Sequence, residues 1–185
     1  MHSLAVQATS PTRKIPMCNL FANITPSNDL QEHFNVLPAN NHLGNMPALT
    51  AIYPGHEAPV VRVAGNEERQ LARMNWGFLT PNYSKRDGKP IKPRIWNNAR
   101  DDKLMSAPLW RSSFHQHRCL IPATSYCETK GRQPAEHFWF GMPAEDPDDR
   151  PLFALAGLWR EEELSISGDL EAGVNSDLKI NHIVD

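Results

Sequence analysis

The apolar residues of this chain fall into short runs separated by proline, glycine and polar clusters. These runs predict strands over residues 59–63, 71–78, 118–121, 137–140 and 151–160. The first two flank the turn sequence Ala64-Gly65-Asn66, so we expect them to pair as a hairpin. One helix is predicted over residues 27–34, with Ser27 as its N-cap and Asp29 in its first turn. We therefore expect an α+β fold with a mainly antiparallel, barrel-like β-sheet and short flanking helices.

The composition supports this class and excludes several functions. Sixteen prolines and ten glycines disfavour a helical bundle, while 40% hydrophobic residues suffice for a core. The formal net charge of −2 gives no general attraction to nucleic acid, so any nucleic-acid site must be a local groove. No apolar run approaches the roughly 18 residues of a transmembrane helix, so we expect no membrane partner. The three cysteines are too few for a disulfide framework, which favours a reducing, cytoplasmic location.

One stretch departs from the near-neutral charge balance. Residues 82–94 hold five of the 19 Lys and Arg residues, and we expect a long loop there. One interpretation is a solvated loop without a binding function. The other is a phosphate-contacting rim for single-stranded nucleic acid, because Trp76 and Trp96 flank the segment and aromatic rings beside clustered cations suit that ligand.

Two further residue sets carry weaker signals. If residues 115–119 form a strand, His115, His117 and Cys119 share one face, and all three are zinc-ligand types. Structural zinc sites use paired ligand clusters, so we favour a half-buried strand and expect neither a metal site nor a cofactor. The chain contains no G-x-S-x-G sequence, so its scattered Ser, His and Asp residues give no signal for a catalytic triad.

Four separated motifs carry most of the functional information. They are Met17-Cys18, Trp76-Gly77, Asn97-Asn98-Ala99-Arg100, and the segment RCLIPA that leads to Glu128. In this order, and with the FALAGLW sequence at 153–159, they resemble the SOS response-associated peptidase (SRAP) family. The resemblance covers roughly residues 17–160, and the opening MCNLF stands where M-C-G-R-F is commoner. It implies one SRAP-like domain over residues 17–185.

The resemblance implies binding to single-stranded DNA, covalent coupling to abasic sites and removal of the protein's own leading residues. An N-terminal cysteine suits this chemistry because it carries an α-amine, with a pKa of roughly 8, beside a thiol. The amine attacks the aldehyde of the ring-opened abasic sugar to form a Schiff base, and the thiol then closes a thiazolidine ring. An internal cysteine has only an amide nitrogen. Cys18 must therefore become the first residue.

By motif position, the resemblance also implies roles for other residues. Asn98 would orient the N-terminal amine or the sugar oxygen, and Glu128 would act as general acid and base with a pKa raised by partial burial. Arg100 would contact a phosphate, and Trp76, with Gly77 after it, would stack on or wedge beside a base. Without the resemblance, each of these residues has an equally good structural interpretation. Asn98 would lie in a turn and Arg100 on the surface, while Trp76 would pack in the core and Glu128 would lie in an exposed loop.

Two features depart from the family pattern. Residues 1–16 precede Met17, and we expect either a true start at Met17, which we favour, or a disordered leader that is cleaved before Cys18. After Trp159 the chain lacks the late H-x-R-M-P segment in which the family places an acid/base histidine, and His182 lacks that context. We therefore expect a domain incomplete at its C-terminal end.

Three functions stay open from the sequence. The first is a monomeric enzyme that crosslinks itself to abasic sites in single-stranded DNA. The second is a non-catalytic remnant that binds single-stranded DNA without the late histidine. The third is an N-terminal-nucleophile amidase that acts on other peptides.

Overall fold

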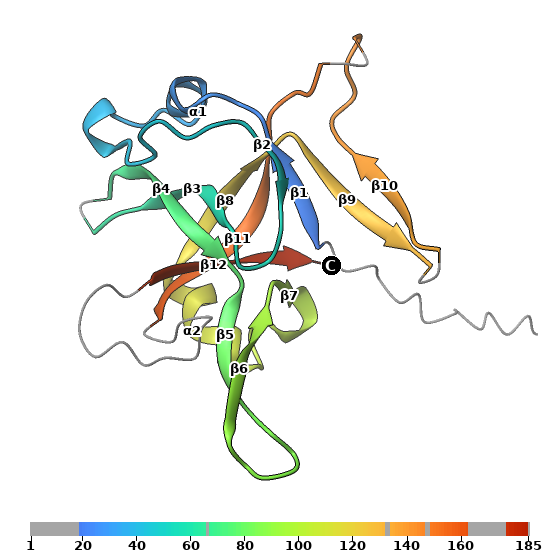
Figure 1. Ribbon diagram of the computed structural model, residues 1–185. Coiled ribbons are helices and arrows are strands. Elements are labelled where there is room, and N and C mark those ends of the chain that lie inside the picture. Colours follow the sequence, from blue (N-terminus) through green and yellow to red (C-terminus); the bar gives the residue numbers. More distant parts are fainter. Residues whose placement is uncertain (1–18, 66, 132–133, 147–148, 163–176, 185) are drawn as a thin grey trace, which may run out of the picture.

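The computed structural model describes residues 19–65, 67–131, 134–146, 149–162 and 177–184, and within the last range only the side chain of Ile180. Cys18 and the predicted leader therefore lie outside the described residues. The elements in chain order (Figure 1) are β1 (Leu20–Asn23), α1 (Ser27–His33), η1 (Pro38–Asn40), β2 (Leu49–Ile52), β3 (Glu57–Val63), β4 (Arg69–Trp76), β5 (Phe78–Tyr83), β6 (Pro90–Trp96), β7 (Asn98–Arg100), η2 (Asp101–Lys103), α2 (Pro108–Gln116), β8 (Arg118–Ala123), β9 (Ser125–Lys130), β10 (Glu136–Phe140), β11 (Phe153–Glu162) and β12 (Asp177–Val184).

Most of these strands belong to two sheets. The larger has the strand order β11-β8-β3-β4-β12-β7, and β11 also pairs with β12, so this sheet curls back on itself. The smaller has the order β10-β9-β1-β2. Pairing is antiparallel throughout both sheets except where β12 runs parallel to β4 and β7. The expected α+β class, with a mainly antiparallel, barrel-like sheet and short helices, is confirmed.

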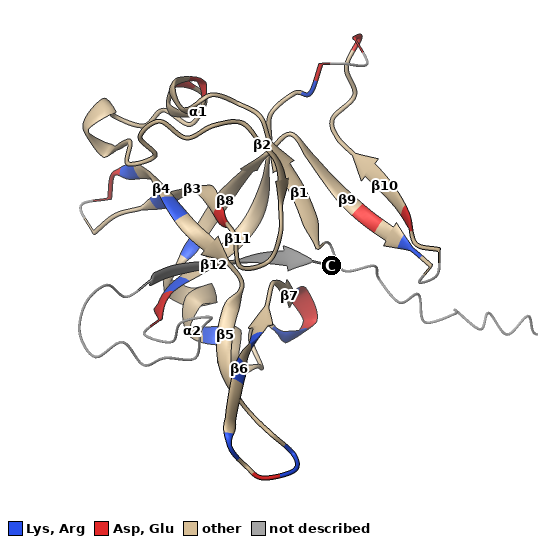
Figure 2. Ribbon diagram, viewed as in Figure 1, with Lys and Arg blue, Asp and Glu red and all other residues tan. Residues whose placement is uncertain are grey.

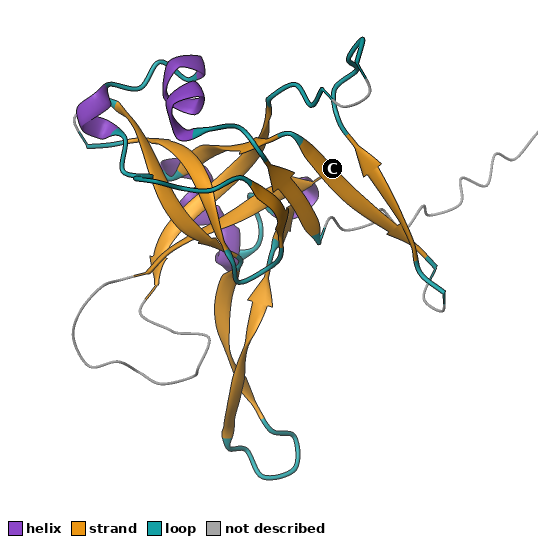
Figure 3. Cartoon of the chain, turned by 45° about the horizontal axis from the view of Figure 1, so that its top comes forward, coloured by secondary structure: helices purple, strands orange, loops and turns teal. Residues whose placement is uncertain are grey.

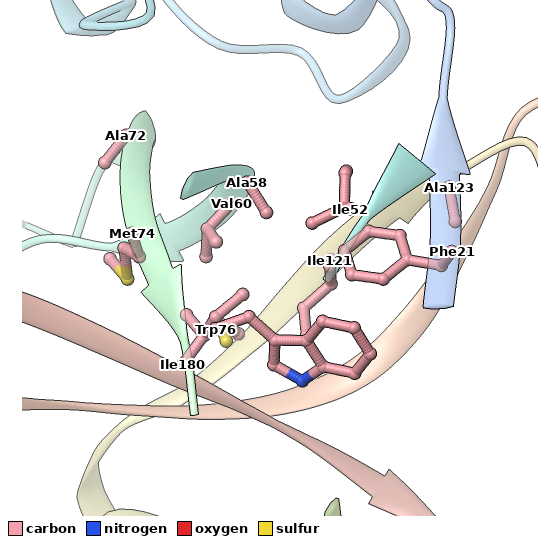
Figure 4. Close-up of a cluster of buried hydrophobic side chains, with 11 residues drawn as sticks. Phe21, Ile52, Ala58, Val60, Ala72, Met74, Trp76, Ile121, Ala123 and Ile180 are labelled. Atoms are coloured by element: carbon pink, nitrogen blue, oxygen red, sulfur yellow. The ribbon is translucent and has the colours of Figure 1, made fainter. Parts of the chain in front are cut away.

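The main core lies between the curled sheet and strands β1 and β2. Figure 4 shows the buried side chains of this cluster, which come from both sheets. Phe21 of β1 and Trp76 of β4 meet edge to face, with ring centroids 4.9 Å apart. Because aromatic side chains bury large apolar areas, this contact ties the smaller sheet to the larger one.

The two α-helices cover opposite parts of the sheet. Leu30 of α1 packs in a cluster with Val61 and Leu71, while Trp110 of α2 packs against Phe78 at 5.4 Å between ring centroids. Among the described residues, no helix is long and apolar enough to cross a membrane.

The predicted strands and helix are confirmed with small differences. Residues 59–63, 71–78, 118–121, 137–140 and 151–160 correspond to β3, β4, β8, β10 and β11, and residues 27–34 to α1. Ser27 is not the N-cap, because Pro26 takes that position and the Ser27 hydroxyl instead accepts a hydrogen bond from Asn41 Nδ2 at 3.1 Å. Strand β4 ends at Trp76, since the chain turns at Gly77 before β5 begins.

Two predictions of local structure are wrong. Most of segment 82–94 is not a loop, because β5 and β6 pair into a two-stranded ribbon. Its prolines read as turn signals, but both strands are edges of a ribbon, where a missing N–H is tolerated. The segment 115–119 is not one strand either. Helix α2 continues to Gln116, so His115 does not share a strand face with Cys119.

Candidate active site

The antiparallel pairing of β1 with β9 brings Glu128 to the start of the described chain. Leu20 pairs with Cys127 and Phe21 with Tyr126. Strand β1 begins at Leu20, so Asn19 lies one position beyond the last pair, on the side of the antiparallel ladder toward Glu128. Asn19 follows Cys18 directly in the sequence. The fold therefore brings Glu128, from the fourth sequence motif, to the residue that adjoins the first motif.

Hydrogen bonds join the second and third motifs to the same place. Asn97 Nδ2 donates to Asn19 Oδ1 at 2.9 Å, and the indole Nε1 of Trp76 donates to the Asn97 carbonyl oxygen at 2.8 Å. Asn98, the next residue, is buried at the start of β7 and pairs in backbone register with His182 of β12. Segments that are distant in sequence thus meet beside Asn19.

Gly77 makes this meeting sterically possible. Its backbone lies in the positive-φ region, at +118°, and a Cβ built there would fall 2.3 Å from Ile95 Cγ2. Its N–H donates to the Ile180 carbonyl oxygen of β12 at 2.7 Å. Only glycine combines this conformation with such a close approach. Gly77 therefore forms the turn between the two strands: β4 ends at the site, and β5 runs away from it.

Glu128 lies in a partly buried position that raises the pKa of its carboxyl group. Its side chain is half-buried, and the described residues offer no hydrogen-bond partner to its buried Oε2 atom. Burial raises the pKa of this carboxyl group above its usual value. Its cross-strand neighbour on β10 is Phe138, an apolar side chain. A carboxyl group held in this way retains its proton to higher pH, as a general acid requires.

The structure places Trp76 in the core and not at a DNA-facing surface. Its side chain is fully buried in contact with Phe21, so a base has no access to the ring in this conformation. What Trp76 does here is hold the Asn97 carbonyl group.

Arg100 is already paired. Its Nε and Nη2 atoms lie 3.0 and 3.2 Å from the two carboxylate oxygens of Asp102, and this hydrogen bonding lowers the pKa of Asp102. The Arg100 side chain is 59% exposed. A phosphate approaching it must therefore compete with Asp102.

The two described cysteines are poor nucleophiles. Cys119 and Cys127 are both buried, and burial raises the pKa of each thiol. The Cys127 Sγ atom lies 3.7 Å from His137 Nδ1, yet the thiol stays desolvated. Within the described residues no group of three His, Cys, Asp or Glu side chains is placed to hold a metal ion. The chemistry we expect thus depends on Cys18, which lies outside the described residues.

Two contributors to the site do not follow from the motifs themselves. Asn19 follows the first motif, and Asp102 lies shortly after the third motif. Their residue types gave the only available signal, since asparagine and aspartate side chains favour local hydrogen bonding. The partners they choose depend on contacts between distant segments.

A curled β-sheet domain in which the second, third and fourth motifs meet beside Asn19 defines the class of this protein. The chain belongs to the SOS response associated peptidase (SRAP) family, whose profile matches residues 17–173. This membership confirms the resemblance drawn from the motifs.

Two named relatives are similar to this chain in sequence. The abasic site processing protein YobE of Bacillus subtilis is 28% identical over 157 residues, covering 83% of this chain and 66% of its own. The abasic site processing protein YoqW of the same organism is 28% identical over 148 residues, covering 78% of this chain and 61% of its own. The chain thus spans slightly less than two thirds of the length of these curated relatives.

Solved structures share the fold. A protein from Bordetella bronchiseptica superimposes with a TM-score of 0.59 at 17% identity, over 90% of this chain and 71% of that one. A phage-related protein of the same organism gives a TM-score of 0.58 at 19% identity, over 90% of this chain and 68% of that one.

Proposed function

We propose that this protein binds single-stranded DNA at abasic sites and crosslinks itself to them through Cys18, once that residue is N-terminal. Family membership and the names of the two Bacillus relatives support the substrate. The observation that carries the proposal is the β1–β9 register, in which Leu20 pairs with Cys127 beside Glu128, together with the hydrogen bond from Asn97 to Asn19, the residue adjoining Cys18.

The proposed reaction has two bond-forming steps. The neutral α-amine of Cys18 attacks the C1′ aldehyde of the ring-opened sugar, and loss of water from the resulting carbinolamine gives the Schiff base. Glu128, whose pKa is raised by burial, donates the proton that lets the hydroxyl group leave as water. It then takes a proton back from the iminium nitrogen, which leaves the neutral imine. The Cys18 sulfur then bonds to the same carbon while its proton moves to the imine nitrogen, which closes the thiazolidine ring. Ring closure is intramolecular and so is favoured by proximity.

Asn98 and Arg100 complete the proposed site. Asn98 orients the amine or the sugar oxygen from its buried position in β7, and Arg100 binds a flanking phosphate after releasing Asp102. Trp76 and Gly77 act by positioning, because the indole holds the Asn97 carbonyl group and the glycine allows the turn beside it.

The proposal also includes a peptidase step, in which hydrolysis of the Met17–Cys18 peptide bond exposes the amine. This self-processing accords with the family's description as a peptidase of the SOS response. The same description names the SOS response, so we place the proposed reaction in the response to DNA damage.

Intact mass spectrometry tests the proposal directly. Protein expressed with residues 1–185 and protein that begins at Met17 are each incubated with an oligonucleotide carrying one abasic site. We expect a mass that begins at Cys18 plus one oligonucleotide, less water, and none of this adduct for Cys18→Ala. Cys127→Ala is the matched control and should still form the adduct.

Three results would contradict the proposal in different ways. An adduct that persists in Cys18→Ala would contradict the thiazolidine chemistry. Salt-sensitive binding without an adduct would instead identify a non-catalytic DNA-binding protein. Turnover of an added peptide would favour an amidase that acts in trans.

A further inference from the structure

The ribbon formed by β5 and β6 stands apart from the rest of the fold. The pairing runs from Phe78 opposite Trp96 at its base to Tyr83 opposite Pro90 near its tip. Figures 1 and 3 show it extending from the body as a separate arm. With six residues in β5 and about 3.3 Å per residue, each strand is roughly 20 Å long.

The arm concentrates positive charge in a chain whose net charge is −2. Figure 2 shows the basic residues along β6 and around the tip. The arm carries a single acidic residue, Asp87, against five exposed cations, which are Lys85, Arg86, Lys89, Lys92 and Arg94. Its charge is therefore opposite in sign to that of the whole molecule.

The described carboxylates do not neutralise the lysines of the arm. In the body, Arg73 pairs with Glu57, Arg100 with Asp102 and Arg160 with Glu162. On the arm the ion pair is Arg86 with Asp87, at 3.6 Å, and the Arg86 side chain is 91% exposed. No described carboxylate lies within ion-pair distance of the three lysines, Lys85, Lys89 and Lys92.

The arm is ordered by its own contacts before any ligand binds. Trp96 Nε1 donates to Thr80 Oγ1 at 3.0 Å, and the Arg94 guanidinium lies 4.5 Å above the Trp96 ring. At the tip, the Ser84 N–H donates to the Lys89 carbonyl oxygen at 2.8 Å, and Gly88 adopts a positive φ of +68°. A cationic surface held in a fixed shape loses less conformational freedom when it binds.

The base of the arm lies at the candidate active site. Strand β5 begins directly after Trp76-Gly77, and β6 ends directly before Asn97-Asn98. The hydrogen bond from Trp76 Nε1 to the Asn97 carbonyl oxygen closes this base. A polyanion lying along the arm is therefore led to the site residues.

From these observations we propose that the β5–β6 arm binds the phosphodiester backbone of single-stranded DNA on one side of the lesion, mainly through Lys85, Lys89 and Lys92. This inference rests on the proposed function, and it adds a binding surface outside the reacting centre. Each lysine that neutralises a phosphate releases counterions from the strand, so the arm contributes a salt-dependent part of the affinity.

The test compares two triple variants of the full chain. Lys85→Gln, Lys89→Gln and Lys92→Gln together neutralise the arm. Arg69→Gln, Arg111→Gln and Arg150→Gln remove the same charge from exposed residues outside it. Fluorescence anisotropy measures the Kd for an undamaged, labelled single strand between about 50 and 200 mM salt. Thermal melting of each variant verifies that it is folded.

We expect the arm variant to bind more weakly and to lower the slope of log K against log salt by about 2, at about 0.7 per phosphate contact. The control triple variant should keep the wild-type slope. Equal slopes in wild type and arm variant, or equal losses in both variants, would overturn the proposal.

Crosslinking at saturating protein and low salt separates this proposal from the proposed function. If the arm variant binds weakly but still forms the adduct at saturation, the arm acts in binding alone, as proposed. If wild-type protein binds DNA through the arm but forms no adduct, the proposed reaction fails while the arm proposal stands.

Discussion

The side-chain amide of Asn97 donates a hydrogen bond to Asn19 across 78 residues of sequence, with 2.9 Å between Nδ2 and Oδ1. Asn19 adjoins Cys18, and Asn97 adjoins Asn98. One contact between two polar side chains therefore links the start of the described chain to the segment that carries the third motif. The contact is exposed, so its stabilising effect is modest and its positioning effect matters more.

Replacing Asn97 by alanine should slow crosslinking more than it destabilises the fold. Loss of this hydrogen bond costs about 1 kcal/mol, which corresponds to roughly a fivefold effect on the population of the correctly placed N-terminus. Crosslinking rates and the melting temperature are measured together. Asn45→Ala, an exposed asparagine in the segment before β2, is the control and should change neither. A large drop in melting temperature for Asn97→Ala would assign the residue a structural role instead.

Replacing Glu128 by glutamine should abolish proton donation without weakening the fold at neutral pH. Because burial raises the pKa of Glu128 in the folded state, the folded protein binds more protons than the unfolded one between the two pKa values. The free energy of unfolding therefore falls as pH rises from the pKa of Glu128 in the unfolded chain to its raised pKa in the folded protein. Glutamine removes that loss.

Thermal unfolding from pH 4 to pH 8 measures this effect. The melting temperature of Glu128→Gln, relative to wild type, should rise with pH across the window above about 4.3, the ordinary pKa of glutamate, and then stay constant. Glu136→Gln changes an exposed carboxyl on β10 and serves as control. A Glu128→Gln variant that crosslinks at the wild-type rate would exclude this residue as the general acid.

Replacing Gly77 by alanine should destabilise the protein by about 3 kcal/mol. The new Cβ would lie 2.3 Å from Ile95 Cγ2, and alanine disfavours the positive φ at this position. Chemical denaturation gives the free energy of unfolding. Gly65→Ala is the matched control, because a Cβ there meets no atom within 4 Å, and it should change stability little. Equal stabilities for the two variants would show that the turn at Gly77 adapts to a side chain.

Replacing Asp102 by asparagine should strengthen DNA binding. The substitution removes the carboxylate that holds Arg100 at 3.0 and 3.2 Å, so the guanidinium is released to a phosphate. We expect Kd for single-stranded DNA to fall about two- to fivefold, as for an exposed ion pair worth up to about 1 kcal/mol. Asp101→Asn removes the same charge without touching Arg100 and should have a smaller effect. Tighter binding of equal size in both variants would point to net charge alone.

The sequence by itself determined the elements whose patterns are local. Short apolar runs bounded by turn residues specify β3, β8 and β11, because a buried strand needs apolar side chains whatever its partner is. The order of the motifs likewise identified the family and selected Glu128. Charge clustering on residues 82–94 was equally visible, since counting cations needs no fold.

Tertiary structure decided how these pieces are used. Strand β9 and strand β12 carry weak patterns of their own and are specified by pairing, β9 between β1 and β10, and β12 beside β11. Trp76 is buried because Phe21 arrives from a distant strand, and Arg100 is held because Asp102 turns back toward it. Side-chain type limits what a residue can do, but burial and hydrogen-bond partners come from chain segments far apart in sequence. For that reason the motifs indicated which residues belong together, and the fold decided what each of them contacts.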